Sequence, residues 1–158
     1  GIRDDLVTGV QTCALPISGR VIAANAGIIV SKVILIKQTK EKKFIILDMG
    51  MNDLMRPALY DAKHQFLCLA KKIFRKEEAY DIVGPVCETS DLFAQNIKLP
   101  QIKNGEFMAL RSAGAYGAVM SNEYNARPLI AEILVDKNKF KIIRRSPSFA
   151  EMTRLEDI

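Results

Sequence analysis

The stretch at residues 28–48, IIVSKVILIKQTKEKKFIILD, decides the fold class of this chain. Residues 28–36 are rich in β-branched side chains and residues 44–48 form a short apolar run, so both predict strands. Residues 37–43 between them are mostly charged and predict a turn. The stretch is therefore expected to supply two strands joined by a polar turn.

The same pattern of short strands and turns continues along the chain. An Asn104-Gly105 pair is a turn signal ahead of another strand, and residues 136–139 predict the turn of a hairpin. The further predicted strands are residues 64–71, 80–86, 106–111, 129–135 and 140–144. Many short strands separated by turns favour a mainly β fold, a sandwich or a barrel.

Short helices are expected near both ends of this β region. Residues 20–27 predict a helix that stops at Gly27. Near the C-terminus, Ser148 and Glu151 have the spacing of a capping box, which predicts a short terminal helix.

Length and composition exclude several classes of protein. A chain of 158 residues with 49% apolar and 26% charged residues is expected to form one domain with a core. The formal net charge is +5, but lysines alternate with glutamates, which is typical of a solvated surface rather than a nucleic-acid interface. No apolar run reaches the roughly 18 residues of a membrane span. Three cysteines without paired spacing and one histidine argue against a disulfide framework, a zinc finger or another metal site.

The first eighteen residues, GIRDDLVTGVQTCALPIS, differ from the rest of the chain. They lack a sustained helical or strand period and lack the features of a secretory signal. Residues 7–17 resemble the in-frame translation of a common short-read sequencing adapter. We therefore interpret residues 1–18 as a non-native segment, the alternative being an ordinary N-terminal arm. On this interpretation Cys13 carries no chemistry, and the native protein extends upstream of Gly19.

Three polar, glycine-bearing stretches interrupt the predicted strands. We call them loop 1 (residues 48–60), loop 2 (residues 83–91) and loop 3 (residues 112–125). Loops carried on a rigid β scaffold are where binding and catalytic residues concentrate. The three loops are therefore the candidate functional regions.

Loop 1 contains a possible anion-binding pair. Arg56 offers a rigid fork of donors for a carboxylate or phosphate, and Tyr60 could add a phenol hydroxyl. Pro57 disfavours helix at Arg56. The alternative is structural: Arg56 pairs with Asp53 or Asp61, and Tyr60 fills the core.

Loop 2 contains a cysteine next to a carboxylate, Cys87 and Glu88. A thiol keeps its proton at neutral pH and suits a general acid, whereas a nucleophile would need activation. His64 could approach Cys87 in three dimensions, but nothing in the sequence shows it. The alternative for Cys87 is a small buried apolar side chain.

Loop 3 has Gly114 and Gly117 on either side of Tyr116. Glycines allow a backbone to approach a ligand closely, as phosphate-binding turns require. The pattern alone is weak, because glycines are common in tight turns.

Four segments, taken together, resemble the C-terminal half of the diaminopimelate decarboxylases. They are GMNDLMRPALYDAKH, VGPVCETSD, LRSAGAYGAVMSNEYNARP and AEILVD, and they occur in family order. This family contains pyridoxal-phosphate enzymes of the alanine racemase-like fold type, with a (β/α)8 barrel that carries the cofactor lysine and a C-terminal β-domain. The resemblance implies that residues 29–158 are this β-domain, a β-barrel or sandwich, and that residues 19–28 are the tail of the barrel. It also implies a cytoplasmic or plastid homodimer in which each β-domain completes the partner subunit's active site.

The resemblance assigns cofactor contacts to both ends of the motif set. Gly19 and Arg20 match the end of a Glu-Pro-Gly-Arg motif, whose backbone holds the cofactor phosphate and whose Arg contacts substrate. Ile17 and Ser18 stand where Glu and Pro are expected, as they would if a non-native segment cut through the motif. Tyr116 matches a tyrosine that contacts both the cofactor phosphate and the substrate.

The remaining matched residues belong to the substrate side of the site. Arg56 and Tyr60 match a substrate-binding pair, and Cys87 matches the proton donor. Glu88 matches the carboxylate that reads the distal amino group of the substrate. Ornithine decarboxylases of this fold type usually carry Asp after the Cys, so Glu88 favours the diaminopimelate branch.

The resemblance implies a decarboxylase that converts meso-2,6-diaminopimelate to L-lysine and carbon dioxide. The cofactor, pyridoxal 5′-phosphate, acts as the electron sink, and Cys87 returns a proton to the substrate carbon. No lysine here matches the cofactor lysine, so this chain alone is expected to be inactive. The alternatives are a sister decarboxylase acting on ornithine, arginine or carboxynorspermidine, a non-catalytic homologue, or a general ligand-binding β-barrel.

Overall fold

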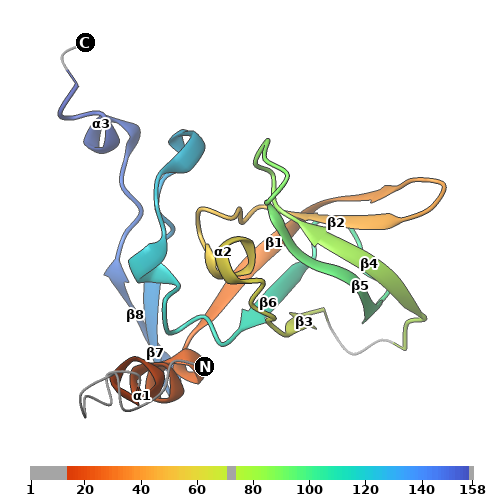
Figure 1. Cartoon of the computed structure of the whole chain (residues 1–158), viewed down its shortest axis with the longest axis horizontal. Helices are drawn as coiled ribbons and strands as arrows, with labels where there is room; N and C mark the ends of the chain where they lie inside the picture. The colour runs from red at the N-terminus through yellow and green to blue at the C-terminus, as the bar shows by residue number, and fades with distance from the viewer. Residues whose placement is uncertain (1–13, 71–73, 157–158) are drawn as a thin grey trace, which may run out of the picture.

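The computed structural model describes residues 14–70 and 74–156, and side chains from residue 19 onward. Within this part, the chain forms a six-stranded sheet, a separate two-stranded hairpin and three α-helices (Figure 1). The strands are β1 (Ile28–Gln38), β2 (Lys43–Leu47), β3 (Phe66–Cys68), β4 (Glu77–Val83), β5 (Leu92–Pro100), β6 (Phe107–Arg111), β7 (Glu132–Asp136) and β8 (Lys139–Arg144). The helices are α1 (Ala14–Ala23), α2 (Arg56–Tyr60) and α3 (Phe149–Met152), with 3₁₀ turns at Ala24–Ala26, Ala118–Met120 and Tyr124–Ala126.

The six-stranded sheet has the order β3-β6-β1-β2-β4-β5, and all its pairs are antiparallel except β2 with β4. The long strand β1 joins its two halves. The first five residues of β1 pair with β6, and the part from Val33 onward pairs with β2. Along β1, Ile29, Ser31 and Val33 are buried while their neighbours are exposed, as expected for a strand with one face on a core.

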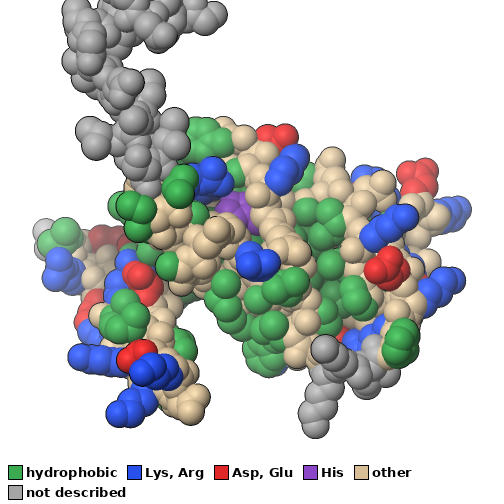
Figure 2. Space-filling model, turned by 90° about the horizontal axis from the view of Figure 1, so that it is seen from below, with side chains coloured by type: hydrophobic (Ala, Val, Ile, Leu, Met, Phe, Trp, Pro, Cys, Tyr) green, Lys and Arg blue, Asp and Glu red, His purple; other side chains and the backbone are tan. Residues whose placement is uncertain are grey.

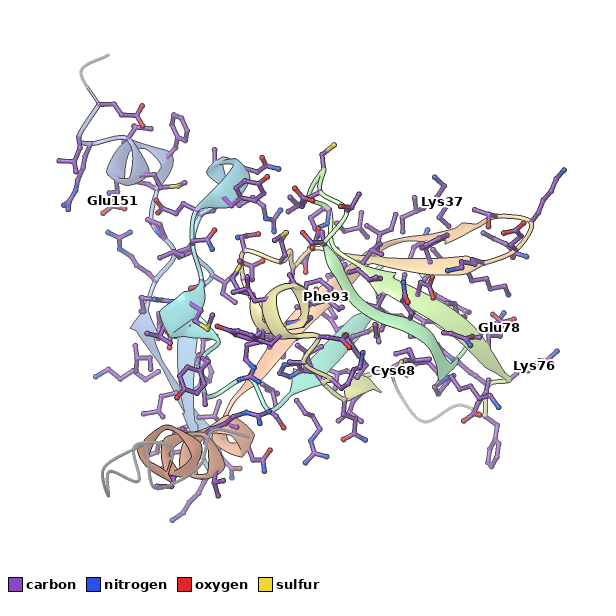
Figure 3. All side chains as sticks on the ribbon, in the orientation of Figure 1. Lys37, Cys68, Lys76, Glu78, Phe93 and Glu151 are labelled. Atoms are coloured by element: carbon purple, nitrogen blue, oxygen red, sulfur yellow. The ribbon has the colours of Figure 1, made fainter. Side chains whose placement is uncertain are left out.

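The core is a single apolar cluster between the sheet and the loops that cover it. Its residues come from all six strands of the sheet and from loops 1 and 3, as expected for a curved, barrel-like sheet. Phe93 on β5 lies near α2 in the middle of the molecule, far from Glu151 in α3 (Figure 3). The buried members are Ile29, Val33, Ile45, Leu47, Met49, Leu54, Phe66, Tyr80, Ile82, Phe93, Leu99, Ile102, Met108, Leu110 and Ala113.

The hairpin β7–β8 and helix α3 extend away from the six-stranded sheet (Figure 1). Ser148 caps α3 by accepting from the Glu151 amide, and the Glu151 side chain accepts from the Ser148 amide, so the predicted capping box is confirmed. The predicted hairpin is also confirmed, and Ile133 and Ile142 face each other across it. None of the described helices is long and apolar enough to span a membrane.

The mainly β fold class is confirmed, but one strand was not predicted. Strand β5 contains Asn96 in a left-handed conformation (φ 51°), and the pairing of β4 with β5 shifts in register near this point. Such a bulge breaks the alternation of apolar and polar residues that marks a strand. The strand expected at residues 64–71 is present but spans only Phe66–Cys68, and part of the expected range lies outside the described residues.

Two expectations about helices were wrong. Arg56 is the first residue of α2, because Pro57 falls in the first turn, where its missing N–H leaves no helical bond unmade. Helix α1 begins at Ala14, so residues 14–18 are helical although they showed no helical period, whereas the stop at Gly27 is confirmed. Residues 1–13, including Cys13, lie outside the described part of the chain.

Candidate active site

Loop 1 is held by a buried polar turn that leads into α2. The Asp53 amide donates to the Gly50 carbonyl (2.9 Å), and the Asp53 carboxylate accepts from the Gly50 amide (2.8 Å). Asn52 and Asp53 are both buried. Because this turn is bonded to itself, it fixes where α2 starts and where Arg56 and Tyr60 leave the backbone.

Arg127, just beyond loop 3, ties loop 1 to loop 3. Its guanidinium donates to the Asp48 carbonyl (2.6 Å) and to the Asn52 side chain (3.1 Å), and lies 3.5 Å from the Asp53 carboxylate. The Asn122 backbone amide donates to the Asn52 carbonyl (3.0 Å), and the Asn52 side-chain NH₂ donates to the Asn122 carbonyl (3.2 Å). Burial raises the pKa of Asp53, while the Gly50 amide and the Arg127 charge act in the opposite direction.

Asp91 ties loop 1 to loop 2. One carboxylate oxygen accepts from the Met51 amide and the other from the Val86 amide, each at 2.7 Å. The carboxylate is buried, and burial raises the pKa of Asp91. Loop 2 is therefore anchored directly before Cys87.

Cys87 and Glu88 lie at the exposed side of loop 2. The alternative of Cys87 as a buried apolar side chain is therefore wrong, and its thiol is accessible from solvent. Hydrogen bonds from Thr89 and Ser90 lower the pKa of Glu88, so its carboxylate is ionised at neutral pH. An ionised carboxylate in this position can pair with an ammonium group.

Loop 3 turns tightly against the end of α1. The Gly114 amide donates to the Ala24 carbonyl (3.0 Å), and a Cβ at Gly114 would collide with the carbonyl oxygen of Ala23. Tyr116 follows in a left-handed conformation (φ 58°), which costs an L-residue about 1 kcal/mol or more. The turn therefore fixes the backbone from which the Tyr116 side chain projects.

Arg56 and Tyr116, from loops 1 and 3, meet in the structure. The guanidinium carbon of Arg56 lies 5.9 Å from the centre of the Tyr116 ring, within cation–π range. The Nε atom of Arg56 is buried and has no hydrogen-bond partner. A buried N–H without an acceptor is costly, so this atom is a donor suited to an anionic group brought by a ligand.

The structural alternatives for loop 1 do not describe what is found. Asp53 pairs with Arg127, and Asp61 pairs with Lys63 at the surface, so neither carboxylate is the partner of Arg56. Tyr60 is 64% exposed and does not fill the core. Its phenol is therefore available to a ligand or to another part of a larger protein.

His64 joins this cluster, although its sequence context suggested no role beyond a possible approach to Cys87. Its Nδ1 lies 2.9 Å from the Arg111 carbonyl, so Nδ1 carries the proton and Nε2 is the acceptor. Burial lowers the pKa of His64, and the charges of Arg56 and Arg20 lower it further. Figure 2 shows the single histidine with Lys and Arg side chains around it. The imidazole is therefore neutral at pH 7.

Gly19 and Arg20 lie inside α1, and both are exposed. Gly19 is the sixth residue of this helix, so its amide points along the helix axis toward the carbonyl of the preceding turn. In this conformation the Gly19 amide is not at a helix N-terminus, where a phosphate would bind. The charge of the exposed Arg20 side chain contributes to the lowering of the His64 pKa.

The residues of this cluster fit an anionic cofactor such as pyridoxal 5′-phosphate. The Arg56 guanidinium lies within cation–π range of the Tyr116 ring, and the two side chains carry donors of the kind that a phosphate or carboxylate requires. The buried and unbonded Nε of Arg56 supports this assignment.

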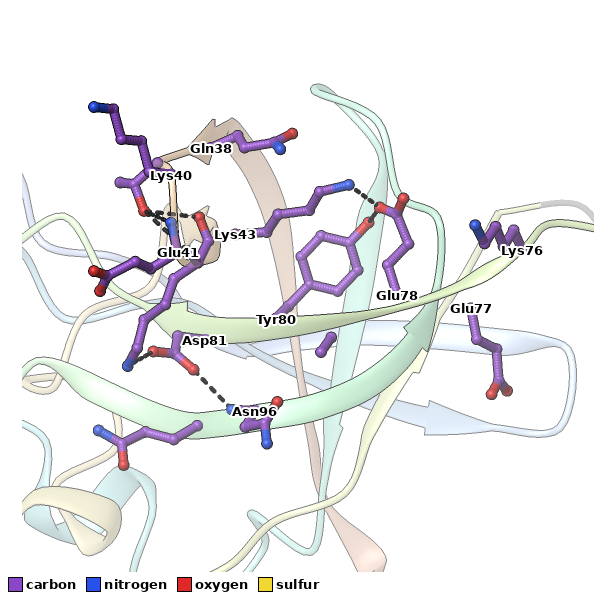
Figure 4. A pocket seen from close by; sticks show the side chains of 14 residues that line it. Gln38, Lys40, Glu41, Lys43, Lys76, Glu77, Glu78, Tyr80, Asp81 and Asn96 are labelled. Carbon is purple, nitrogen blue, oxygen red and sulfur yellow. Dashed lines mark hydrogen bonds and ion pairs between the residues drawn. The ribbon is translucent and has the colours of Figure 1, made fainter.

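A groove between the β1–β2 turn and strands β4 and β5 differs from the loop cluster in character (Figure 4). There Asp81 bonds to Lys42 (2.8 Å) and Glu78 to Lys43 (2.7 Å). The Tyr80 hydroxyl also donates to Glu78 (2.9 Å). These charges are neutralised within the protein, so this groove is a weaker ligand site than the cluster at the loops.

Sequence reasoning missed the residues that hold the loops together. Asn52, Asp53, Asp91 and Arg127 make the bonds between loops, yet none was singled out as a site residue. The available signal was weak: polar residues next to glycines inside loops already marked as functional.

Comparisons with known proteins agree with the fold. The family model described as "Pyridoxal-dependent decarboxylase, C-terminal sheet domain" matches residues 17–114. Diaminopimelate decarboxylase of Zymomonas mobilis is 49% identical over 140 residues, which cover 87% of this chain and 32% of that protein. The enzyme of the same name from Vibrio cholerae is 45% identical over 140 residues, or 89% of this chain and 33% of that protein.

Solved structures give the same result. The crystal structure of diaminopimelate decarboxylase from Helicobacter pylori complexed with L-lysine is similar to this chain, with a TM-score of 0.81 and 37% identity. The match covers 87% of this chain and 33% of that one. The chain thus spans about a third of the length of the relatives it matches. Because the family model matches more than half of its residues, the chain belongs to the family of the C-terminal sheet domain of pyridoxal-dependent decarboxylases.

Proposed function

We propose that this chain is the C-terminal third of a pyridoxal-phosphate-dependent diaminopimelate decarboxylase. The parent enzyme converts meso-2,6-diaminopimelate to L-lysine and carbon dioxide. The observation that carries the proposal is that Asp91 bonds loop 1 to loop 2 and Arg127, just beyond loop 3, bonds to loop 1, so that the three loops with the candidate residues are joined. Identity of 49% with the Zymomonas mobilis enzyme supports the choice of substrate.

The residues divide the work between binding and proton transfer. Pyridoxal 5′-phosphate, when bound, accepts the electron pair released as the bond between the substrate carbon and its carboxylate breaks. Arg56 binds an anionic group through its unbonded Nε, and Tyr60 and Tyr116 add phenol donors. Cys87 donates its thiol proton to the carbon that lost carbon dioxide, and solvent returns a proton to the thiolate.

Glu88 selects the substrate. Its ionised carboxylate pairs with the distal ammonium group, which diaminopimelate carries next to a second carboxylate. A site built to bind both distal charges rejects analogues that lack one of them, because its own polar groups would be left unpaired. Arg20 offsets substrate carboxylate charge at the opposite edge of the cluster.

The rest of the parent supplies what this chain lacks. We propose that residues 19–28 are the end of an N-terminal (β/α)8 barrel and that the cofactor lysine lies in that barrel. We propose that in the parent, where native residues precede Gly19, the backbone at Gly19 holds the cofactor phosphate. We also propose a homodimer with shared active sites, in the cytoplasm or in a plastid.

The function is tested in a chimeric enzyme. Residues 19–158 replace the matching C-terminal third of the Zymomonas mobilis enzyme, and release of carbon dioxide from diaminopimelate is measured. The chimera is expected to be active. Loss of activity in a chimera that still binds the cofactor would contradict the proposal, and a preference for ornithine or arginine would favour a sister decarboxylase.

Cys87→Ala in this chimera tests the proton donor. The turnover number is expected to fall by about two orders of magnitude or more, with the cofactor absorbance unchanged, because general acids typically contribute 10²–10⁴-fold. Cys68→Ala, which removes a half-buried thiol on β3, is the matched control and should keep its activity. An unchanged rate in Cys87→Ala would refute the assignment.

Resequencing the source DNA across the codons for residues 6–21 tests the status of the N-terminal segment. A frame that continues upstream into Glu-Pro before Gly19, with a lysine-bearing barrel, supports the enzyme. DNA that encodes residues 1–18 as given favours a non-catalytic β-domain.

A further inference from the structure

We propose that Asp91 is a positioning residue that sets the placement of the Cys87–Glu88 pair by fixing loop 2 to the backbone of loop 1. This inference rests on the proposed function and extends it to a residue that touches neither substrate nor cofactor. Asp91 acts through the backbones of loops 1 and 2.

The two oxygens of the Asp91 carboxylate serve two different loops. Oδ1 accepts from the Met51 amide in loop 1 (2.7 Å), and Oδ2 accepts from the Val86 amide in loop 2 (2.7 Å). Both bonds join an ionisable acceptor to a backbone donor, a strong class of hydrogen bond. One side chain therefore fixes the distance between two loops that lie 35 residues apart in sequence.

Loop 2 is built around this carboxylate. The Gly84 amide donates to the Asp91 carbonyl (3.0 Å), and the Asp91 amide donates to the Glu88 carbonyl (3.1 Å). A Cβ at Gly84 would collide with the Asp91 carboxylate, so the backbone packs directly against it. The carboxylate is thus enclosed by its own loop and has little freedom to move.

The two anchored amides are close to the candidate catalytic residues. Val86 directly precedes Cys87, so a shift of the Val86 amide moves the thiol with it. Met51 begins the turn at Asn52 that leads into α2 and Arg56. Because a misplacement of about 1 Å at a reacting group can cost on the order of a hundredfold in rate, the link has kinetic consequences.

Asp81 offers a matched control on β4. It is also a buried aspartate that accepts a backbone bond, from the Asn96 amide (2.7 Å), and a bond from Lys42 (2.8 Å). It lies on β4, two residues before loop 2, but its side chain lines the separate groove beside the β1–β2 turn, where it bonds Lys42 (Figure 4). Replacing either aspartate removes a buried hydrogen-bonded carboxylate, but only Asp91 joins candidate site loops.

The test compares Asp91→Asn with Asp81→Asn in the chimeric holoenzyme. An Asn side chain accepts one of the two amide bonds and places its own NH₂ against the other, so loops 1 and 2 separate. The turnover number of Asp91→Asn is expected to fall at least tenfold with cofactor absorbance retained, while Asp81→Asn stays within twofold of the parent chimera. A loss of the same size in both variants would show a general effect on stability and would overturn the proposal.

The alkylation rate of Cys87 by iodoacetamide reports on loop 2 without any need for catalysis. Peptide mass mapping is expected to show a severalfold change at Cys87 in Asp91→Asn, and no change at Cys68. Gly84→Ala, which displaces the carboxylate without removing it, is expected to reproduce the effects and serves where Asp91→Asn fails to fold. An unchanged turnover number in both loop variants overturns the positioning role, whatever the alkylation shows. A parent chimera without decarboxylase activity refutes the proposed function instead, and the alkylation rates then decide whether Asp91 places the loop.

Discussion

Replacing Arg127 by Met should loosen loop 1 and loop 3 together. The change keeps the bulk of the side chain and removes a guanidinium that bonds the Asp48 carbonyl (2.6 Å) and the Asn52 side chain (3.1 Å). It also removes the cation 3.5 Å from Asp53, whose side chain is 1% exposed. Asp53 keeps its bond from the Gly50 amide but becomes a buried charge without a counter-ion.

The expected cost is about 3 kcal/mol in the free energy of local opening. Removing one partner of a buried ion pair costs about 3–5 kcal/mol. The lower end applies because the Arg127 side chain is 29% exposed, so solvent already screens part of the interaction. At about 1.4 kcal/mol for each tenfold change, backbone amides of residues 50–55 should exchange roughly a hundredfold faster.

The loss in the free energy of local opening caused by Arg127→Met should be larger at neutral pH than at lower pH. Burial already raises the pKa of Asp53, and loss of the Arg127 charge raises it further. A carboxyl whose pKa is higher in the folded state takes up a proton there first, so the penalty is full at neutral pH. The penalty then shrinks as the pH falls toward the ordinary range of an aspartate.

Hydrogen exchange followed by peptide mass spectrometry measures this effect in the chimera at pH 7.5 and pH 5.5, after correction for intrinsic rates. Arg144→Met is the matched control, because its bridge to Glu132 (2.8 Å) lies at the surface of the hairpin. This control should change the opening free energy by less than about 1 kcal/mol. Equal exchange in Arg127→Met and the parent, or a deficit that grows from pH 7.5 to pH 5.5, would refute the reasoning.

Two further predictions concern the chain itself. The imidazole of His64, the one histidine of the sequence, should show a pKa below that of a free histidine when it is titrated by NMR. Arg56→Gln should raise the pKa of His64, because it removes a nearby cation. A His64 pKa at or above that of a free histidine would contradict the described environment. The isolated chain should self-associate in light scattering through the exposed apolar side chains of β7 and β8, and Ile133→Lys with Ile142→Lys should reduce this; a monodisperse parent chain that melts cooperatively would contradict it.

The sequence predicts the parts of the fold that local signals encode. The β-branched run of β1, the turn of the β7–β8 hairpin and the capping box at Ser148 each depend on residues close together in the chain. Their geometry follows from backbone preferences, and the structure confirms all three. The breaks in the strand pattern at the three loops were also predicted, because polar residues and glycines interrupt the strands there, although loop 1 ends in helix α2.

The missed features depend on tertiary structure or on exact position. Strand β5 contains a left-handed Asn96 whose amide bonds the Asp81 side chain, a contact that no local pattern of β5 predicts. The start of α2 at Arg56 depends on the buried turn before it, which outweighs the preference against helix before a proline.

In the candidate site, too, local sequence signals identified some residues, whereas residues whose role depends on tertiary structure were missed. Residues expected to touch a ligand, such as Arg56 and Cys87, were recognisable by motif, whereas Asp91 and Arg127 were not. Their partners lie 40 and 75 residues away in the chain, in Met51 and Asn52, and only folding brings them together.

The two buried aspartates beside β4 show how the loops differ from the sheet. At Asp81, burial raises the pKa, but Lys42 and the Asn96 amide outweigh it, and the net shift is downward. At Asp91, backbone amides replace the lysine as direct partners, and burial prevails, so the net shift is upward. The negative charge of ionised Asp91 is therefore less well compensated by its surroundings than the charge of Asp81. A carboxylate that only stabilised the fold would not be expected to carry such a poorly compensated charge. What Asp91 provides is one rigid acceptor for two loops that no strand ladder joins, and the proposed proton transfer by Cys87 depends on that geometry.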